Sequence, residues 1–157
     1  MKPLSTTVEI KIAANQLAAF EHIVPIDLSS IFTGYGILPA VTGTQNQVGA
    51  WDTAGQTRTV HFADNSSARE LLTTYAYPHY FSYTLSDFTG SLGLLASSAK
   101  GEWWFNTDIS GKTTIKWHYT FNARSIFAVP VLWFVANFLW RGYMNKALSL
   151  SVEFLND

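Results

Sequence analysis

The longest regular pattern in the chain predicts a helix over residues 130–155, close to the C-terminus. A helix of about 26 residues would be roughly 39 Å long, at 1.5 Å per residue. Polar residues recur at every fourth position and would form one narrow stripe along it: Asn137, Arg141, Asn145, Ser149 and Glu153. The other faces are apolar, so we expect the rest of the chain to cover most of this helix.

The segments before this helix mostly alternate between apolar and polar residues, as half-buried strands do. The first strand is predicted at residues 6–13. Two short helices should follow, because Asn15 and Asp27 are suited to cap helix N-termini and Pro25 ends the first helix. Further strands are predicted between turns, and residues 89–98 are expected to form a flexible loop; the strand segments are 41–48, 57–62, 68–77, 80–88, 101–108 and 113–121.

Strands that are joined by short turns pair in an antiparallel manner. We therefore predict an α+β fold, in which a curved antiparallel sheet of about six to seven strands wraps around the long C-terminal helix. The two short helices lie after the first strand. A chain of 157 residues with no internal repeat and no linker is expected to form one domain, 1–157.

Composition narrows the possible functions. Ten Lys and Arg balance eleven Asp and Glu, so no basic surface is expected for phosphate backbones, which argues against nucleic acid as a partner. Charged residues make up 13% of the chain, against about 25% in an average domain, and aromatic residues make up 15%. Either the core is unusually aromatic or rings line an internal cavity. The N-terminus alternates and lacks an apolar signal core, so we expect a cytoplasmic protein.

The apolar run 126–140 has a second interpretation. It is 15 residues long, whereas a membrane-spanning helix needs about 20, and it contains Pro130 and Asn137. This favours a buried helix over a membrane span. A transient contact with a bilayer through Trp133, Phe134 and Trp140 remains compatible with the pattern.

Arg58 is the informative exception to the strand pattern, because it lies on the face of its strand that the alternation places inside. Burying a lone charge is very costly. If the turn at Asp64 is a three-residue loop, Arg58 lies opposite Glu70, and we predict an internal cross-strand ion pair. This ion pair has two interpretations. Either Arg58 and Glu70 only compensate each other's charge and fix the strand register, or Arg58, together with Tyr83, binds the polar group of a ligand in an apolar cavity.

The same alternation places several rings on the helix-facing side of the sheet, and Trp51 would either shield a cavity mouth or pack in a turn. We predict that eight residues bind a ligand there: Arg58, Glu70, Tyr83, Trp103, Phe105, Trp117, Tyr119 and Phe138. The chain has no cysteine, and its four histidines are widely separated, so we expect no metal site. No Gly-rich phosphate loop and no nucleophile elbow occur, and no cofactor is expected.

The order and spacing of these segments resemble the START-like superfamily over residues 6–155, although no single motif is diagnostic. More narrowly, they resemble the polyketide cyclase/dehydrase and lipid-transport proteins (SRPBCC), which share their fold with the birch-pollen allergen. The residues that carry the resemblance are Trp51, Gly55, Arg58, Val60 and Phe62; Glu70, Leu71 and Leu72; Phe81 and Tyr83; Gly101, Trp103 and Phe105; and Trp117, Tyr119 and Phe121.

The resemblance implies a helix-grip fold with a deep cavity for a hydrophobic ligand, such as a lipid, a sterol, a polyketide or an aromatic compound. Arg58 and Glu70 match an Arg and a Glu that recur in this subgroup, and Tyr83 matches an aromatic position. The very apolar start of the last helix departs from the pattern of a purely soluble carrier.

Three functions remain open at this point. The first is binding or transport of a hydrophobic small molecule, with Arg58 and Glu70 orienting its polar end. The second is a cyclase or dehydratase in which Glu70 and Tyr83 exchange protons and Arg58 stabilises a developing enolate. The third is a module that docks on a membrane or a partner through residues 127–140. The sequence does not predict an oligomeric state.

Overall fold

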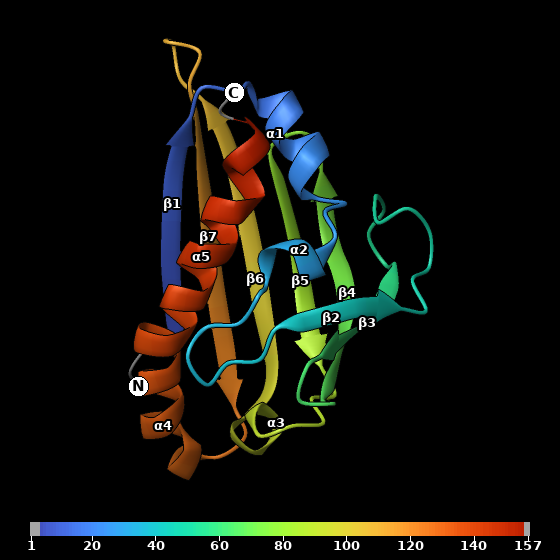
Figure 1. Cartoon of the computed structure of the whole chain (residues 1–157), viewed down its shortest axis with the longest axis vertical. Helices are drawn as coiled ribbons and strands as arrows, with labels where there is room; N and C mark the ends of the chain where they lie inside the picture. Colours follow the sequence, from blue (N-terminus) through green and yellow to red (C-terminus); the bar gives the residue numbers. More distant parts are fainter. Residues whose placement is uncertain (1–3, 156–157) are drawn as a thin grey trace.

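The computed structural model describes residues 4–155, which form a seven-stranded antiparallel sheet curved around a long C-terminal helix (Figure 1). The strand order is β1-β7-β6-β5-β4-β3-β2, so the first strand pairs with the last strand in the chain. This arrangement confirms the predicted α+β helix-grip fold. The strands are β1 (Ser5–Ile12), β2 (Val41–Gln45), β3 (Thr57–Phe62), β4 (Ser67–Ala76), β5 (Tyr80–Ser86), β6 (Ala96–Thr107) and β7 (Thr113–Ala123).

Two short helices follow β1, as the capping residues predict. In α1 (Gln16–Ile23), the side chain of Asn15 accepts a hydrogen bond from the backbone N–H of Ala18 at 2.9 Å. In α2 (Leu28–Ile31), Asp27 accepts from the N–H of Ser29 at 3.0 Å. These bonds satisfy N–H groups that a helix N-terminus leaves without a partner inside the helix. In Figure 1, α1 lies at the upper end of the sheet and α2 in front of its middle.

The C-terminal helix is continuous over Ile126–Val152, 27 residues, and begins four residues earlier than predicted. Pro130 lies in the first turn of its α-helical part, where the missing N–H has no helical partner to lose. The helix changes geometry along its length: a 3-10 turn (Ile126–Ala128), α4 (Val129–Phe134), a π-helical turn (Val135–Trp140), α5 (Arg141–Val152) and a final 3-10 turn (Glu153–Leu155).

The helix is covered less completely than its sequence predicts. Arg141 and Asn145 are exposed, as expected of the polar stripe, and Asn137 is half-buried, with its side-chain amide donating to the carbonyl of Trp133 at 2.9 Å. Only 28% of the most apolar window of this helix is buried. Phe138, which we expected on the covered side, is 55% exposed.

The predicted loop at residues 89–98 is wrong in its second half. Residues Leu92–Leu95 form the short helix α3, and β6 begins at Ala96, five residues before its predicted start. This strand pairs with β5 on one side and β7 on the other, so both neighbours supply hydrogen bonds to a segment whose Gly and Ser content suggests a loop. In contrast, β2 is shorter than predicted and ends at Gln45.

Stacked rings form the upper core, above the cavity described below. The rings of Trp103 and Trp117 stack with centroids 4.4 Å apart. Phe20 of α1, which is fully buried, packs edge-on against Phe105 at 5.2 Å, and Phe32 packs against Trp117 at 5.9 Å. Such pairs add to the stability that their burial provides. The short helices therefore fill the space over Phe105 and Trp117.

Candidate functional site

A cavity of about 400 Å³ lies between the sheet and the C-terminal helix, below the stacked rings. Its volume is within the range of about 300–1,000 Å³ that is typical of small-molecule sites. Its walls include parts of the five strands β3 to β7, α2, the loop after α2, the segment around α3 and the π-helical turn. Three of its lining residues, Ile37, Asp64 and Ser91, are exposed, and we take them to mark the mouth.

The predicted ion pair is present at the cavity wall. Arg58 lies opposite Glu70 in the β3–β4 register, and its Nε donates to Glu70 Oε1 at 2.6 Å. Both side chains are almost fully buried, with exposed fractions of 6% and 5%. A charge-assisted bond of this length offsets part of the desolvation that burial imposes on each charge. The sequence pattern therefore correctly predicted both the register and the pair.

Trp51 covers the guanidinium of Arg58. Its ring centroid lies 4.0 Å from Arg58 Cζ, a cation–π geometry, and the indole is only 2% exposed. Trp51 adopts a positive φ of 60°, which turns the loop after β2 back over β3. Gln47 of the same loop accepts from Arg58 Nη1 at a longer 3.5 Å. The positive charge of Arg58 is thus enclosed by groups of the protein itself.

Burial dominates the electrostatics of this wall. It raises the pKa of the Glu70 carboxyl above its ordinary value, and the neighbouring Arg58 guanidinium opposes that rise. Burial also raises the pKa of Tyr83, and the nearby Glu70 raises it further. Burial likewise raises the pKa of Tyr119 well above its ordinary value. Both phenols therefore keep their protons near neutral pH.

Tyr83 is held flat against the sheet by a glycine. It pairs with Gly101 across β5 and β6, and a Cβ added to Gly101 would lie 2.3 Å from Tyr83 Cζ. Only glycine permits this approach, since real Cβ contacts are not found below 3.0 Å. The indole Nε1 of Trp103 donates to the Tyr83 hydroxyl at 3.4 Å. The oxygen of Tyr83 is therefore already engaged.

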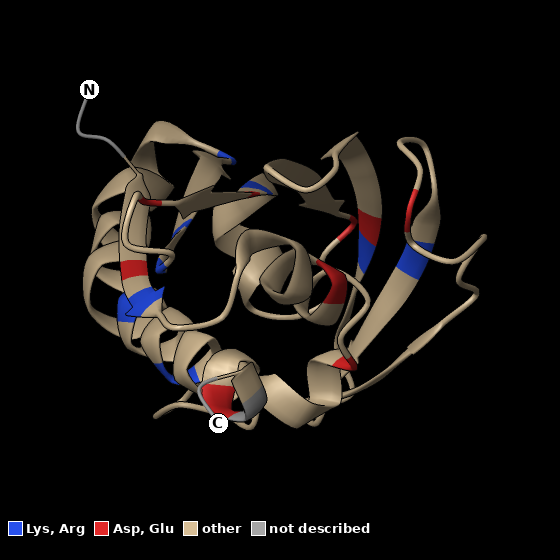
Figure 2. Cartoon of the chain, turned by 90° about the horizontal axis from the view of Figure 1, so that it is seen from above, with Lys and Arg blue, Asp and Glu red and all other residues tan. Residues whose placement is uncertain are grey.

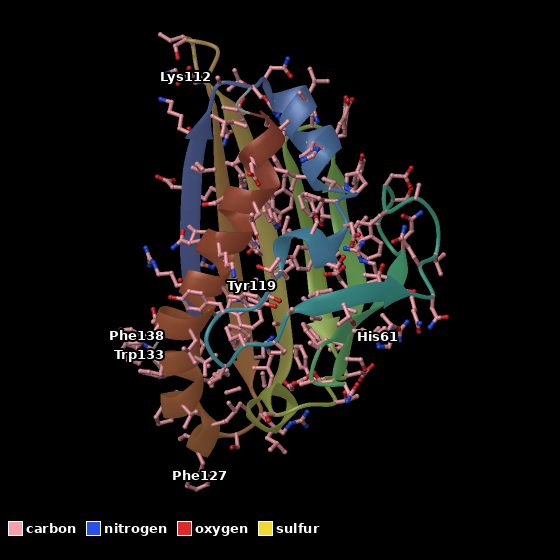
Figure 3. All side chains as sticks on the ribbon, in the orientation of Figure 1. His61, Lys112, Tyr119, Phe127, Trp133 and Phe138 are labelled. Carbon is pink, nitrogen blue, oxygen red and sulfur yellow. The ribbon has the colours of Figure 1, made fainter. Side chains whose placement is uncertain are left out.

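Tyr119 differs from Tyr83 in this respect. Its side chain lies between the sheet and the C-terminal helix (Figure 3), lines the cavity and is 4% exposed. Its ring contacts Trp140 at a centroid distance of 5.2 Å and Tyr83 at 6.4 Å. Within residues 4–155, no hydrogen bond engages the Tyr119 hydroxyl. The Tyr119 hydroxyl is therefore available to form a hydrogen bond with a group that occupies the cavity.

The loop at residues 33–40 forms one wall and is tied to α5 by three contacts. Lys146 Nζ donates to the carbonyl of Gly34 at 2.9 Å, and the hydroxyl of Tyr143 donates to the carbonyl of Pro39. The ring of Tyr35 lies directly on Gly142, where an added Cβ would approach Tyr35 Cζ to 2.2 Å. Sequence reasoning missed this wall because the loop has no periodic pattern.

The structure separates the eight predicted ligand-binding residues into three groups. The five that line the cavity are Arg58, Glu70, Tyr83, Trp103 and Tyr119. Phe105 and Trp117 are not among the lining residues and lie in the ring stack under α1 and α2. Phe138 lies outside the cavity on the exposed face of the helix, so placing it in the cavity was wrong. Its position at helical spacing gave no indication of which face the sheet would cover.

The charges of the chain are sparse and of mixed sign along its strands and helices (Figure 2). No group of three or more His, Cys, Asp or Glu that could hold a metal ion occurs in the described part of the chain.

Comparison with solved structures identifies the fold. A START superfamily protein from Mycobacterium smegmatis superposes with a TM-score of 0.68 at 9% identity, covering 96% of this chain and 98% of that one. Ara h 8.0201 gives 0.66 at 13% identity, with 98% of each chain covered. An uncharacterized protein from Bacillus thuringiensis gives 0.65 at 14% identity, covering 98% and 99%. The chain thus has the START-like helix-grip fold, in agreement with the resemblance of its sequence.

No protein-family model matches the sequence. No curated protein matches it either. The likeness therefore concerns the fold, and the function has to be argued from the cavity.

Proposed function

We propose that the protein binds a hydrophobic small molecule that carries one uncharged oxygen group, such as an alcohol, a phenol or a ketone. The apolar body of the ligand occupies the cavity, and its oxygen forms a hydrogen bond with the Tyr119 hydroxyl. The observation that carries this proposal is Tyr119, a buried side chain that lines the cavity and whose hydroxyl forms no hydrogen bond within the described chain.

The charges of the cavity argue for an uncharged ligand. Its lining contains Arg58, Glu70 and Asp64. The charge of Arg58 is compensated by Glu70 at 2.6 Å, and Asp64 is an exposed acid at the mouth. A carboxylate ligand would lose its hydration without meeting an uncompensated positive charge, which is costly. A hydroxyl or carbonyl loses far less and can pair with the phenol of Tyr119.

The cyclase or dehydratase alternative has less support. It requires Glu70 and Tyr83 to exchange protons with a substrate. The carboxylate of Glu70 is bonded to Arg58, and burial raises the pKa of Tyr83, so its phenol is a poor acid at neutral pH. We therefore infer binding or transport of the ligand rather than its conversion, with Arg58, Glu70, Tyr83 and Trp103 as parts of the polar and aromatic wall.

Calorimetric titration with 2-naphthol and 2-naphthoate tests the proposal, because these ligands share a ring system and differ in charge at neutral pH. We expect 2-naphthol to bind at least about tenfold more tightly, because no uncompensated positive charge in the cavity offsets the lost hydration of the carboxylate. Tyr119→Phe should weaken 2-naphthol binding by about three- to tenfold, the value of one hydrogen bond. Tyr77→Phe is the matched control, because Tyr77 does not line the cavity and its hydroxyl donates to Glu21. Equal or tighter binding of 2-naphthoate would refute the proposal.

A further inference from the structure

The exposed face of the C-terminal helix is apolar over its first half. Phe127, Val131, Phe134 and Phe138 follow one another at spacings of four, three and four residues and so share one face. Their exposed fractions are 88%, 51%, 52% and 55%. The rings of Phe134 and Phe138 stack on the surface with centroids 5.0 Å apart. A soluble helix ordinarily places its polar residues on such a face.

Neighbouring residues enlarge this surface into what we call the apolar end. Ile126 is 79% exposed, and Leu94 of α3, which contacts α4, is 78% exposed. Figure 3 shows Phe127 at the lower tip of the molecule, pointing away from it, and Phe138 pointing outward from the helix. Large exposed apolar patches of this kind mark interaction surfaces in soluble proteins.

The chain segment that carries the apolar helical face has charges of one sign. No acidic residue occurs between Asp108 and Glu153, whereas five of the ten Lys and Arg of the chain do. Two of these, Arg124 and Arg141, are exposed and lie at either end of the apolar helical face in sequence. Arg124 also donates from Nε to the carbonyl of Gly93 at 2.7 Å, which ties α3 to the end of β7. An apolar surface flanked by cations is complementary to an anionic bilayer.

The apolar end is continuous with the cavity. Leu92 and Leu95 of α3 line the cavity, whereas Leu94 between them is exposed on the apolar end. Val135 and Leu139 of the π-helical turn also line the cavity, and Phe134 and Phe138 beside them face outward. The same two elements therefore form both a wall of the cavity and the exposed surface.

We propose that the apolar end docks on the surface of an anionic lipid bilayer, with Phe127 and Phe134 entering the interfacial region and Arg141 contacting lipid phosphates or carboxylates. The helix lies on the bilayer and does not span it, because Tyr143, Met144, Ala147 and Leu148 of α5 are buried in the protein core. A ligand could pass between the bilayer and the cavity at this end only if the proposed function is correct. Docking on the bilayer does not depend on the proposed function.

Co-sedimentation with vesicles tests docking alone. Vesicles of phosphatidylcholine are compared with vesicles that also contain phosphatidylserine. The double variant Phe127→Ser/Phe134→Ser should lower the partition coefficient at least about tenfold, because two exposed rings lose their burial in lipid. Arg141→Gln should lower binding to the phosphatidylserine vesicles by about fivefold and leave binding to phosphatidylcholine unchanged. Ile109→Ser is the matched control, since Ile109 is fully exposed in the β6–β7 hairpin at the opposite end (Figure 1).

Three outcomes would overturn the proposal: absence of wild-type binding to either vesicle, an equal loss in Ile109→Ser, or a dimer in sedimentation equilibrium that the double variant dissociates. The last result would show that a second copy covers the surface. Because Phe127 and Phe134 do not line the cavity, the double variant should retain wild-type affinity for 2-naphthol. Loss of vesicle binding and loss of ligand binding are thus separate results.

Discussion

Arg58→Met would leave the Glu70 carboxylate buried without the guanidinium that now lies 2.6 Å from it. Removing one partner of a buried pair costs about 3–5 kcal/mol, because the remaining charge has lost both water and its counter-ion. Glu70→Leu likewise leaves the Arg58 guanidinium buried without its counter-ion, with only the Trp51 ring and the distant Gln47 amide beside it. We expect each single variant to lose about 3–5 kcal/mol of unfolding free energy.

The double variant Arg58→Met/Glu70→Leu removes both charges and fills the site with apolar atoms. Replacements of this kind are often neutral or stabilising by about 1–4 kcal/mol, so its stability should lie near or above that of the wild type. The coupling free energy between the two sites would then be as large as the sum of the single losses. Urea denaturation followed by tryptophan fluorescence measures all four proteins.

Additive losses in the double variant would refute this reasoning, because they would show that each side chain stabilises the fold through other contacts. Affinity for 2-naphthol separates the two interpretations of the pair. If Tyr119 binds the ligand oxygen, the double variant should keep its affinity within about threefold, less than the value of one hydrogen bond to a charged group. A loss of more than about tenfold would instead make Arg58 the group that binds the ligand.

Two further predictions concern stability. Gly101→Ala should cost about 1–3 kcal/mol in urea denaturation, because the new methyl group meets the buried Tyr83 ring, whereas Gly43→Ala, with no atom within 4 Å, should cost much less. In Arg58→Met, burial raises the pKa of Glu70 above its ordinary 4.5 without opposition, so the folded state keeps a proton that the unfolded state has lost. The stability of this variant should therefore fall as pH rises from about 4.5 through the raised pKa, and equal denaturation curves across that range would contradict it.

The fold was predictable because its signals are periodic. Alternation located the strands, Asn15 and Asp27 fixed the starts of the short helices, and the turn at Asp64 set the register that joins Arg58 to Glu70. Each of these features is encoded in residues that are close together in sequence.

The cavity was only partly predictable, because its walls depend on packing between distant segments. The loop that carries Ile37 is positioned by Tyr35 on Gly142, a contact across about a hundred residues. Apolar residues at helical spacing also do not reveal which face the sheet covers, and for this reason Phe138 was misplaced. Trp140, which one of the two interpretations of the helix placed against a bilayer, is buried against Tyr119. The cytoplasmic location stays a prediction.

The most direct test of ligand binding in the cavity is an NMR titration of the tryptophan indole N–H signals with 2-naphthol. Three indoles line the cavity, those of Trp51, Trp103 and Trp140, and we expect their signals to shift together and to saturate. The indole of Trp104, which lies beside Lys116, is outside the cavity lining and should not move. Shifts confined to Trp104 or Trp133, with the three cavity signals unchanged, would contradict the account.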